Sequence, residues 1–215
     1  QLDAITRGSI LYGNASGATA RLAKGGAGTV LTSDGTDISW TAAGGGAGME
    51  FIASSGAISN SGSVEFTGFD ASKYDSYTLF LMNVLPATDY AGLSMRVSVD
   101  GGSNYLSASN SYSASVSQWT ALGDVNAMPI AYHQAGNSSV ADGGVSGTVN
   151  ILGAALNVPT IISPVTGVMQ GNGLPGIIAV SAKTKAATVV NAVQVFFHTG
   201  NISSGEITFF GIVKE

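Results

Sequence analysis

Hydrophobic and polar residues alternate with a period of two over several stretches that follow residue 48. The odd positions of 93–99 are Leu, Met, Val and Val, while the even positions are Ser, Arg and Ser. A strand places alternate residues on opposite faces, so this pattern predicts a strand with one buried and one wet face. Asp100, Gly101 and Gly102 then supply the positive-φ positions of a tight hairpin turn. In 107–117 every odd position is serine, which favours a strand with these six serines on one face.

Short runs rich in β-branched and aromatic residues recur along the same part of the chain, each bounded by glycine or asparagine. These runs lie at 77–84, 147–154, 176–185, 191–200 and 205–213. Only 69–77 could form a helical turn, with Asp70 as its cap. About nine or ten short strands with turn signals between them predict a sandwich, jelly roll or barrel. We expect an all-β chain with a jelly-roll-like β-sandwich over 49–215.

Residues 1–48 are organised differently and end in the glycine-rich run of 44–48. Short apolar stretches alternate there with turn pairs, and each stretch offers only two or three side chains to a core. Since even an isolated β-hairpin is marginally stable in water, this segment needs partners. Three chains wound into a shaft would supply them, with Tyr12, Leu31 and Trp40 as packing residues and Trp40 against neighbouring chains or the next domain. The alternative is a flexible leader whose Trp40 docks on its own domain.

The composition shows that the chain is rich in hydrophobic residues and poor in charged ones. Hydrophobic residues make up 45% and charged residues 10%, against about 25% charged residues in average soluble proteins. Such a surface is expected where identical neighbours cover much of a subunit, because obligate interfaces resemble a core cut in half. No stretch approaches the roughly 18 to 20 uninterrupted apolar residues of a membrane-spanning helix, so we expect no membrane insertion.

The charges and the absence of cysteine exclude several kinds of partner. The net charge is −5 and the eight Lys and Arg residues are scattered, so there is no basic patch for nucleic acid or anionic lipid. Without cysteine there is no disulfide framework and no thiolate metal site. The chain opens at Gln1 without methionine, and its first residues lack the charged-then-apolar layout of a signal peptide. We therefore expect that Gln1 is not the native start and that an N-terminal part is missing.

Candidate catalytic chemistry is sparse. The stretch GNGLPG at 171–176 matches a dinucleotide fingerprint, but Pro175 lies inside it and a strand follows where a helix is needed. His133 and His198 have no ligand at metal spacing, and there is no nucleophile elbow. No two of the thirteen acidic residues stand out as a pair for glycoside hydrolysis. We expect no enzymatic activity, no cofactor and no bound metal.

A binding site is expected in 117–144, which looks like a long irregular span with aromatic and amide side chains. Loops on a rigid β scaffold are where recognition groups concentrate. Trp119 and Tyr132 would stack on a sugar ring, and His133 and Gln134 would supply hydrogen bonds to a host-surface glycan. The alternative is that Trp119 and Tyr132 are core or subunit-interface residues.

Residues 6–40 resemble a recurrent segment of bacteriophage tail fibres. In that segment an Arg-Gly, an Ile-Leu-Tyr, a Leu-Ala-x-Gly, a Gly-x-Val-Leu and a terminal Trp follow in this order. The matching residues here are Arg7-Gly8, Ile10-Leu11-Tyr12, Leu22-Ala23-Lys24-Gly25, Gly28-Thr29-Val30-Leu31 and Trp40. The family often has Asp after the Arg-Gly, where this chain has Ser9. Residues 66–89, 96–105 and 200–212 are similar to a C-terminal domain that follows this segment in phage virion proteins.

The resemblance implies a homotrimeric fibre on the exterior of the virion, on its tail or its capsid. Its missing N-terminal part would attach it to other virion proteins. The family fixes no binding site, so it assigns no functional residues. We expect a tail fibre that adsorbs to a host-surface polysaccharide, and the alternative is a capsid decoration or head fibre protein without a dedicated receptor. A glycan depolymerase is disfavoured, since neither a tailspike-like repeat nor an acid pair is evident.

Overall fold

The computed structural model describes residues 5–43, 48–116, 120–135, 144–169, 175–177 and 179–214, with the backbone alone at 120–124, 133–135 and 169. All regular structure in these residues is β-strand, arranged in antiparallel pairs. The chain divides into two compact units, Gln1–Gly46 and Ala47–Glu215. We call their described parts the hairpin unit (5–43) and the sandwich unit (48–214). The prediction of an all-β sandwich is confirmed.

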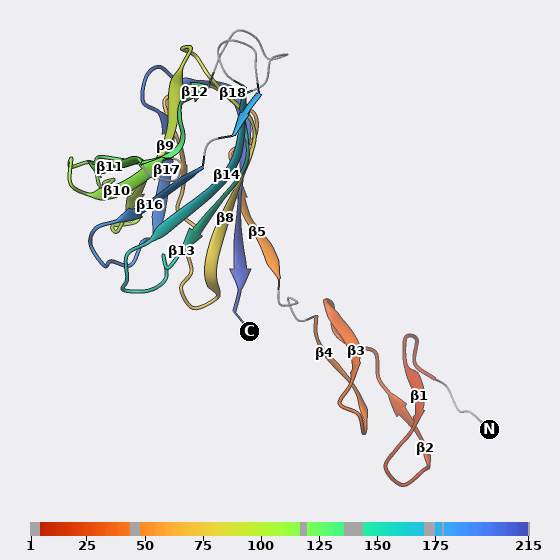
Figure 1. The fold of residues 1–215 in the computed structure, drawn as a ribbon. Coiled ribbons are helices and arrows are strands. Elements are labelled where there is room, and N and C mark those ends of the chain that lie inside the picture. The colour runs from red at the N-terminus through yellow and green to blue at the C-terminus, as the bar shows by residue number, and fades with distance from the viewer. Residues whose placement is uncertain are drawn as a thin grey trace. The chain divides into compact units, whose positions relative to one another are not determined.

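The hairpin unit consists of two separate two-stranded sheets (Figure 1). The first pairs β1 (Ile10–Gly13) with β2 (Thr19–Leu22), and the second pairs β3 (Thr29–Ser33) with β4 (Ile38–Ala42). Each turn is closed by a short polar side chain that accepts backbone N–H groups. Asn14 Oδ1 accepts the N–H of Ser16 at 3.1 Å, and Asp34 Oδ1 accepts the N–H of Thr36 at 2.8 Å. These are the side chains that favour turns, because they compete for nearby backbone hydrogen bonds.

The sandwich unit contains a larger sheet and a smaller sheet that form two layers (Figure 1). The larger sheet has the order β11-β10-β16-β14-β13-β8-β18-β5, with β15 on β14 and β6 on β18. Its strands are β5 (Met49–Ser54), β6 (Ile58–Ser61), β8 (Tyr74–Pro86), β10 (Tyr112–Val116), β11 (Thr120–Val125), β13 (Val145–Leu152), β14 (Ile161–Met169), β15 (Pro175–Ile177), β16 (Val180–Thr184) and β18 (Ile202–Val213). The smaller sheet has the order β12-β9-β17-β7. Its strands are β7 (Val64–Phe66), β9 (Ala91–Ser98), β12 (Met128–Ala135) and β17 (Ala192–Phe197).

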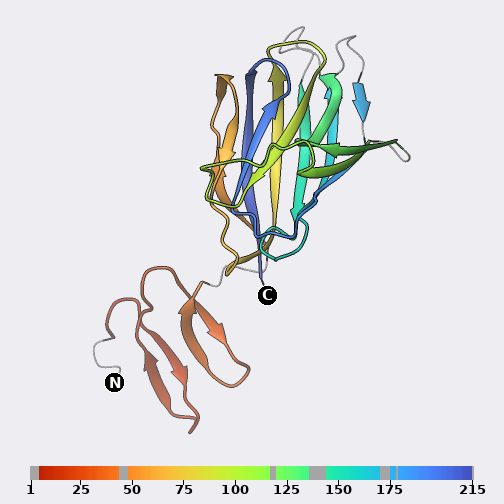
Figure 2. The ribbon, with the colours of Figure 1, turned by 90° about the vertical axis from the view of Figure 1, so that its left-hand side faces the viewer.

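The core lies between the two sheets and follows the alternation of the strands. In β9 the predicted inward residues Leu93, Met95 and Val97 are fully buried, whereas Val99 beyond the strand is 43% exposed. The predicted wet face is wrong, because Ser94 and Ser98 are buried as well. From the larger sheet, Phe209 packs against Tyr77 with ring centroids 5.4 Å apart. The long strands β8, β13 and β18 that carry this side of the core lie next to one another (Figure 2).

A β-bulge in β8 changes which residues of this strand face the core. The registers of β8 with β13 and with β18 both shift by one residue around Asn83, which has a φ of 48°. Leu79 and Leu81 are buried before the bulge and Val84 is buried after it, so the inward positions change from odd to even. Opposite the bulge, Gly147 has a φ of 141°, and a Cβ there would collide with the carbonyl oxygen of Val165.

Three local predictions need correction. The sandwich unit has more strands than the predicted nine or ten, because β6, β7 and β15 are too short to show a period. The positive-φ turn at Gly101 and Gly102 forms, but the next strand, β10, belongs to the other sheet, so no hairpin follows. The serine-rich strand starts only at Tyr112, because 107–111 form turns.

Candidate functional site

The larger sheet has a face that points away from the smaller sheet, and we call it the open face. Its members are the outward positions of the strands, given by register and exposure. From β5 to β14 they are Met49, Phe51, Ser54, Ser76, Thr78, Phe80, Met82, Ser146, Thr148, Asn150, Leu152, Ile161, Ser163, Val165, Glu206, Thr208, Phe210 and Ile212. An outward face of an antiparallel sheet is normally polar, so the large apolar members need a reason.

Five of these side chains form an aromatic patch over β5, β18 and β8: Met49, Phe51, Phe80, Met82 and Phe210. The ring of Phe210 lies in the middle, 5.7 Å from Phe51 and 5.3 Å from Phe80, in edge-to-face arrangements of 78° and 76°. Phe51 is 58% exposed and Met82 is 48% exposed. The patch borders a shallow hollow of about 430 Å³, with the hydroxyls of Thr148 and Thr208 among its lining groups. It offers a partner mainly apolar contact.

The open face carries little charge. Between β5 and β14 its one charged side chain among the outward positions is Glu206, whose carboxylate accepts a hydrogen bond from Ser54 Oγ at 2.7 Å. At the start of β8, Asp75 lies 3.9 Å from Lys214 Nζ, at the margin of the face. The Thr78 hydroxyl donates a hydrogen bond to Asn150 Oδ1 on the neighbouring strand at 3.0 Å. These two polar side chains in the middle of the face are therefore paired with each other.

Towards β10 the open face becomes rich in hydroxyl groups. Ser113, Ser115, Ser181 and Lys183 line a hollow of about 260 Å³ beside Ile161. In the register of β10 with β16, Ser113 is opposite Lys183 and Ser115 is opposite Ser181. This hollow offers hydroxyl groups and one cation to a ligand.

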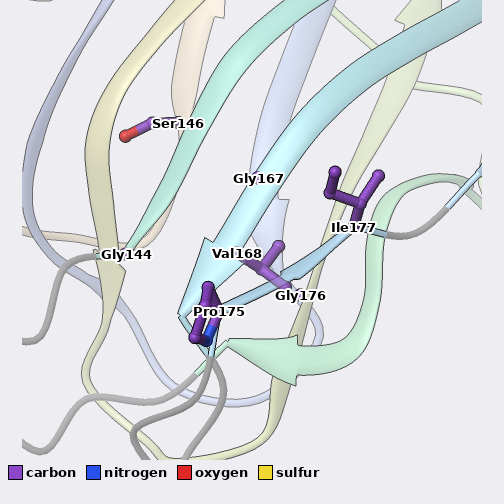
Figure 3. A pocket seen from close by; sticks show the side chains of 7 residues that line it. All are labelled: Gly144, Ser146, Gly167, Val168, Pro175, Gly176 and Ile177. Atoms are coloured by element: carbon purple, nitrogen blue, oxygen red, sulfur yellow. The ribbon is translucent and has the colours of Figure 1, made fainter.

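A third hollow of about 670 Å³ lies where β13 begins and β14 ends, beside the short strand β15 (Figure 3). Figure 3 shows Ser146 on one side of it and Ile177 on the other. The described lining residues are Gly144, Ser146, Gly167, Val168, Pro175, Gly176 and Ile177, none of them ionisable. The hydroxyl oxygen of Ser146 already accepts the N–H of Asn83 at 2.9 Å. Its described lining residues can provide apolar contact but no acid or base.

The structure gives a partial view of the predicted glycan-binding residues. Tyr132 is half-buried on β12, an edge strand of the smaller sheet. His133 and Gln134 follow it on the backbone of β12, while their side chains and Trp119 lie outside the described residues. The span 117–144 was predicted to be irregular, and this is wrong, because it contains β11 and β12. The fully buried Met128 and Ile130 explain why β12 forms.

The predicted shaft residues lie on the strands of the hairpin unit. Tyr12 on β1 is half-buried, and Leu31 on β3 is 43% exposed opposite Trp40 on β4. The indole Nε1 of Trp40 donates to the carbonyl oxygen of Ala23 at 2.7 Å. A Cβ on Gly25 would lie 2.7 Å from the Trp40 ring. Trp40 therefore ties the second hairpin to the segment that joins the two hairpins.

The smaller sheet also has a cluster on its outer side. His198 Nε2 lies 2.8 Å from Ser94 Oγ, and the guanidinium of Arg96 lies 4.5 Å from the centre of the Phe196 ring. A serine bonded to a histidine is the beginning of a nucleophilic arrangement. Ser94 is only 1% exposed, however, so a substrate carbonyl cannot reach its hydroxyl. We interpret the contact as structural.

Comparisons with known proteins give no assignment. No family model matches the chain, and neither a curated protein nor a solved structure is similar to it. Over the described part of the chain, three or more His, Asp or Glu side chains never gather as a metal site would require, and no helix there could cross a membrane. The function is therefore inferred from the residues and geometry above.

Proposed function

We propose that this protein is a homotrimeric virion fibre protein of a bacteriophage, with the hairpin unit in the shaft and the sandwich unit as the tip. The observation that carries this proposal is the lack of a core in the hairpin unit. None of its described residues is buried, and Leu11, Val30 and Leu31 are 38%, 45% and 43% exposed. Two short hairpins with exposed apolar side chains are not stable alone in water.

Neighbouring copies of the same chain would provide the missing contacts. Trp40 and Gly25 hold the two hairpins of one chain together, while Val30 and Leu31 on the adjacent strand β3 stay accessible to other chains. The resemblance of 6–40 to the tail-fibre segment supports three chains around one axis. The proposed location is the exterior of the virion, where the fibre would contact other virion proteins.

The tip would adsorb to a host-surface glycan. A glycan is neutral or weakly charged and is recognised by aromatic faces and hydroxyl or amide groups. Tyr132 on the edge strand β12 is the aromatic side chain of the predicted site that the structure describes. Three equivalent sites would raise the avidity for a dense glycan layer without stronger contacts at each site.

A binding experiment with immobilised bacterial surface polysaccharides tests the adsorption. We expect the full chain to bind at least one of them and Tyr132→Ala to weaken this binding by about tenfold. Tenfold corresponds to about 1.4 kcal/mol, which is the order of what burying a large apolar side chain contributes. Tyr90→Ala is the matched control, because Tyr90 is 57% exposed in the turn between β8 and β9. Equal binding of both variants, with the trimer intact, would contradict the assignment of Tyr132. Adhesion to phage capsids alone would contradict the adsorption itself.

A further inference from the structure

We infer that the aromatic patch on the open face is the surface through which the sandwich units of neighbouring copies contact one another. The inference rests on the proposed trimer and adds the residues that hold its tip together. The hairpin unit alone does not require this, since copies could be joined along the shaft only. The patch would make the tip a part of the assembly and not three independent domains on a stalk.

The first reason is the packing of the patch. Phe51, Phe80 and Phe210 already make edge-to-face contacts across three strands, so the rings are preorganised as a single surface. Met49 and Met82 at its borders are 49% and 48% exposed. Aromatic and methionine side chains are enriched at protein interfaces, and large exposed apolar patches mark interaction sites.

The second reason is charge, and it favours a second copy over an unrelated protein. Around the axis of a trimer the same residues of each copy come close together, so a patch at the axis must be nearly neutral. The chain has a net charge of −5, yet Glu206 is the one charged outward residue around the patch, and Ser54 donates a hydrogen bond to it. On the outer side of the smaller sheet, by contrast, Arg96 and Glu65 are present.

The third reason is size. From β5 to β14 five strands follow one another across the larger sheet, which corresponds to a width of roughly 19 Å at about 4.8 Å per spacing. β13 has 8 residues, which corresponds to a length of about 27 Å. The face is therefore on the order of 500 Å² per copy, or about 1,000 Å² for two copies, which is the lower end of specific protein–protein interfaces. A small ligand would use only the hollow beside the patch and leave most of these apolar groups in water.

A single introduced cysteine tests the inference, because the chain has none of its own. Met82→Cys places a thiol on the patch, and Glu65→Cys places one on the outer side of the smaller sheet as the matched control. In the full chain we expect a maleimide to react with Met82→Cys about tenfold more slowly than with Glu65→Cys, since such an interface excludes solvent like a core. A short bismaleimide should join Met82→Cys chains to each other but not Glu65→Cys chains.

Adding Phe210→Ser to Met82→Cys should raise the labelling rate to that of the control, with circular dichroism confirming that the fold persists. Fast labelling of Met82→Cys in a protein that light scattering shows to be trimeric would overturn the inference and leave the proposed trimer standing. A monomer in solution would overturn both. Slow labelling without any cross-link between copies would also overturn the inference, because something other than a second copy would then cover the patch.

Discussion

The hairpin unit and the sandwich unit are built from the same kind of short antiparallel strands, but only one of them has a core. In the sandwich unit, residues such as Leu93 and Phe209 are fully buried between two sheets. In the hairpin unit none of the described residues is buried, and its contacts are hydrogen bonds of the ladders, the turns and a few side chains, such as Arg21 to Thr6 and Trp40 to Ala23. The difference separates a unit with a core of its own from one whose apolar side chains would be covered by other chains in the proposed trimer.

The largest effect is expected from a substitution in the core of the sandwich unit. Phe209 is fully buried and contacts the rings of Phe66 and Phe69 at 5.3 and 5.0 Å. Phe209→Ala should lower the free energy of unfolding by about 3–5 kcal/mol, measured by urea titration. Leu31→Ala in the hairpin unit should leave the unfolding transition of the sandwich unit unchanged. An equal loss of unfolding free energy in both variants would contradict the claim that only the sandwich unit has a core of its own.

A smaller effect is expected at the bulge that sets the faces of β8. Gly147→Ala places a Cβ against the backbone of Val165 and forces a residue with a side chain to a φ of 141°. Strain of this kind is worth about 1–3 kcal/mol, so the urea midpoint should fall clearly. Gly167→Ala on the neighbouring strand β14 is the control, because its Cβ would meet nothing closer than 4.0 Å. A Gly147→Ala variant as stable as Gly167→Ala would contradict this account of the bulge.

In the hairpin unit the comparable substitution is Gly25→Ala, with Gly26→Ala as its neighbour and control. A Cβ on Gly25 would displace the Trp40 ring, whereas one on Gly26 would lie 4.0 Å from Thr29. Losing the indole hydrogen bond to Ala23 should cost about 1 kcal/mol locally and shift the tryptophan emission to the red. Unchanged emission in Gly25→Ala would show that Trp40 is held in another way.

The smallest effect concerns pH. Hydrogen bonds from the Asn104 side chain, the Ser98 hydroxyl and the Asn104 backbone lower the pKa of Asp100 to about 2. Since this pKa is below that of the unfolded chain, the carboxylate stabilises the fold above pH about 3.8, and this contribution is lost as the pH falls towards 2. Asp100→Asn should therefore flatten the decline of the melting temperature between pH 4 and pH 2. A parallel decline in variant and parent would refute the role of this carboxylate.

The sequence predicted the fold class and the burial of Leu93, Met95 and Val97 because a clear period of two survives there. It did not predict that Ser94 and Ser98 on the other face of β9 are buried too. It did not predict β11 and β12, since apolar and small polar residues in 117–144 follow no simple period. The parity change in β8 was also missed, because nothing local identifies Asn83 as a bulge residue. The position of such a bulge depends on how the strand pairs with its two neighbours, here β13 and β18.

The open face was missed for a related reason, although a signal for it exists. The run YTLFLMNV at 77–84 is apolar on both parities, which led to the prediction of a strand but to no statement about its outward side. A strand that is apolar on both faces is expected to be covered on both faces. Phe80 and Met82 are the outward members of that run, so the sequence did contain a signal that the outward side of this strand is apolar.

The most direct test of the account is the mass of the full chain in solution, measured by light scattering over a dilution series. The lack of a core in the hairpin unit and the aromatic patch on the sandwich unit are the two observations from which we infer contact with other copies of the chain. The account therefore predicts a particle of three chains, three times 21.5 kDa, that persists on dilution. A particle of 21.5 kDa at all concentrations would contradict it.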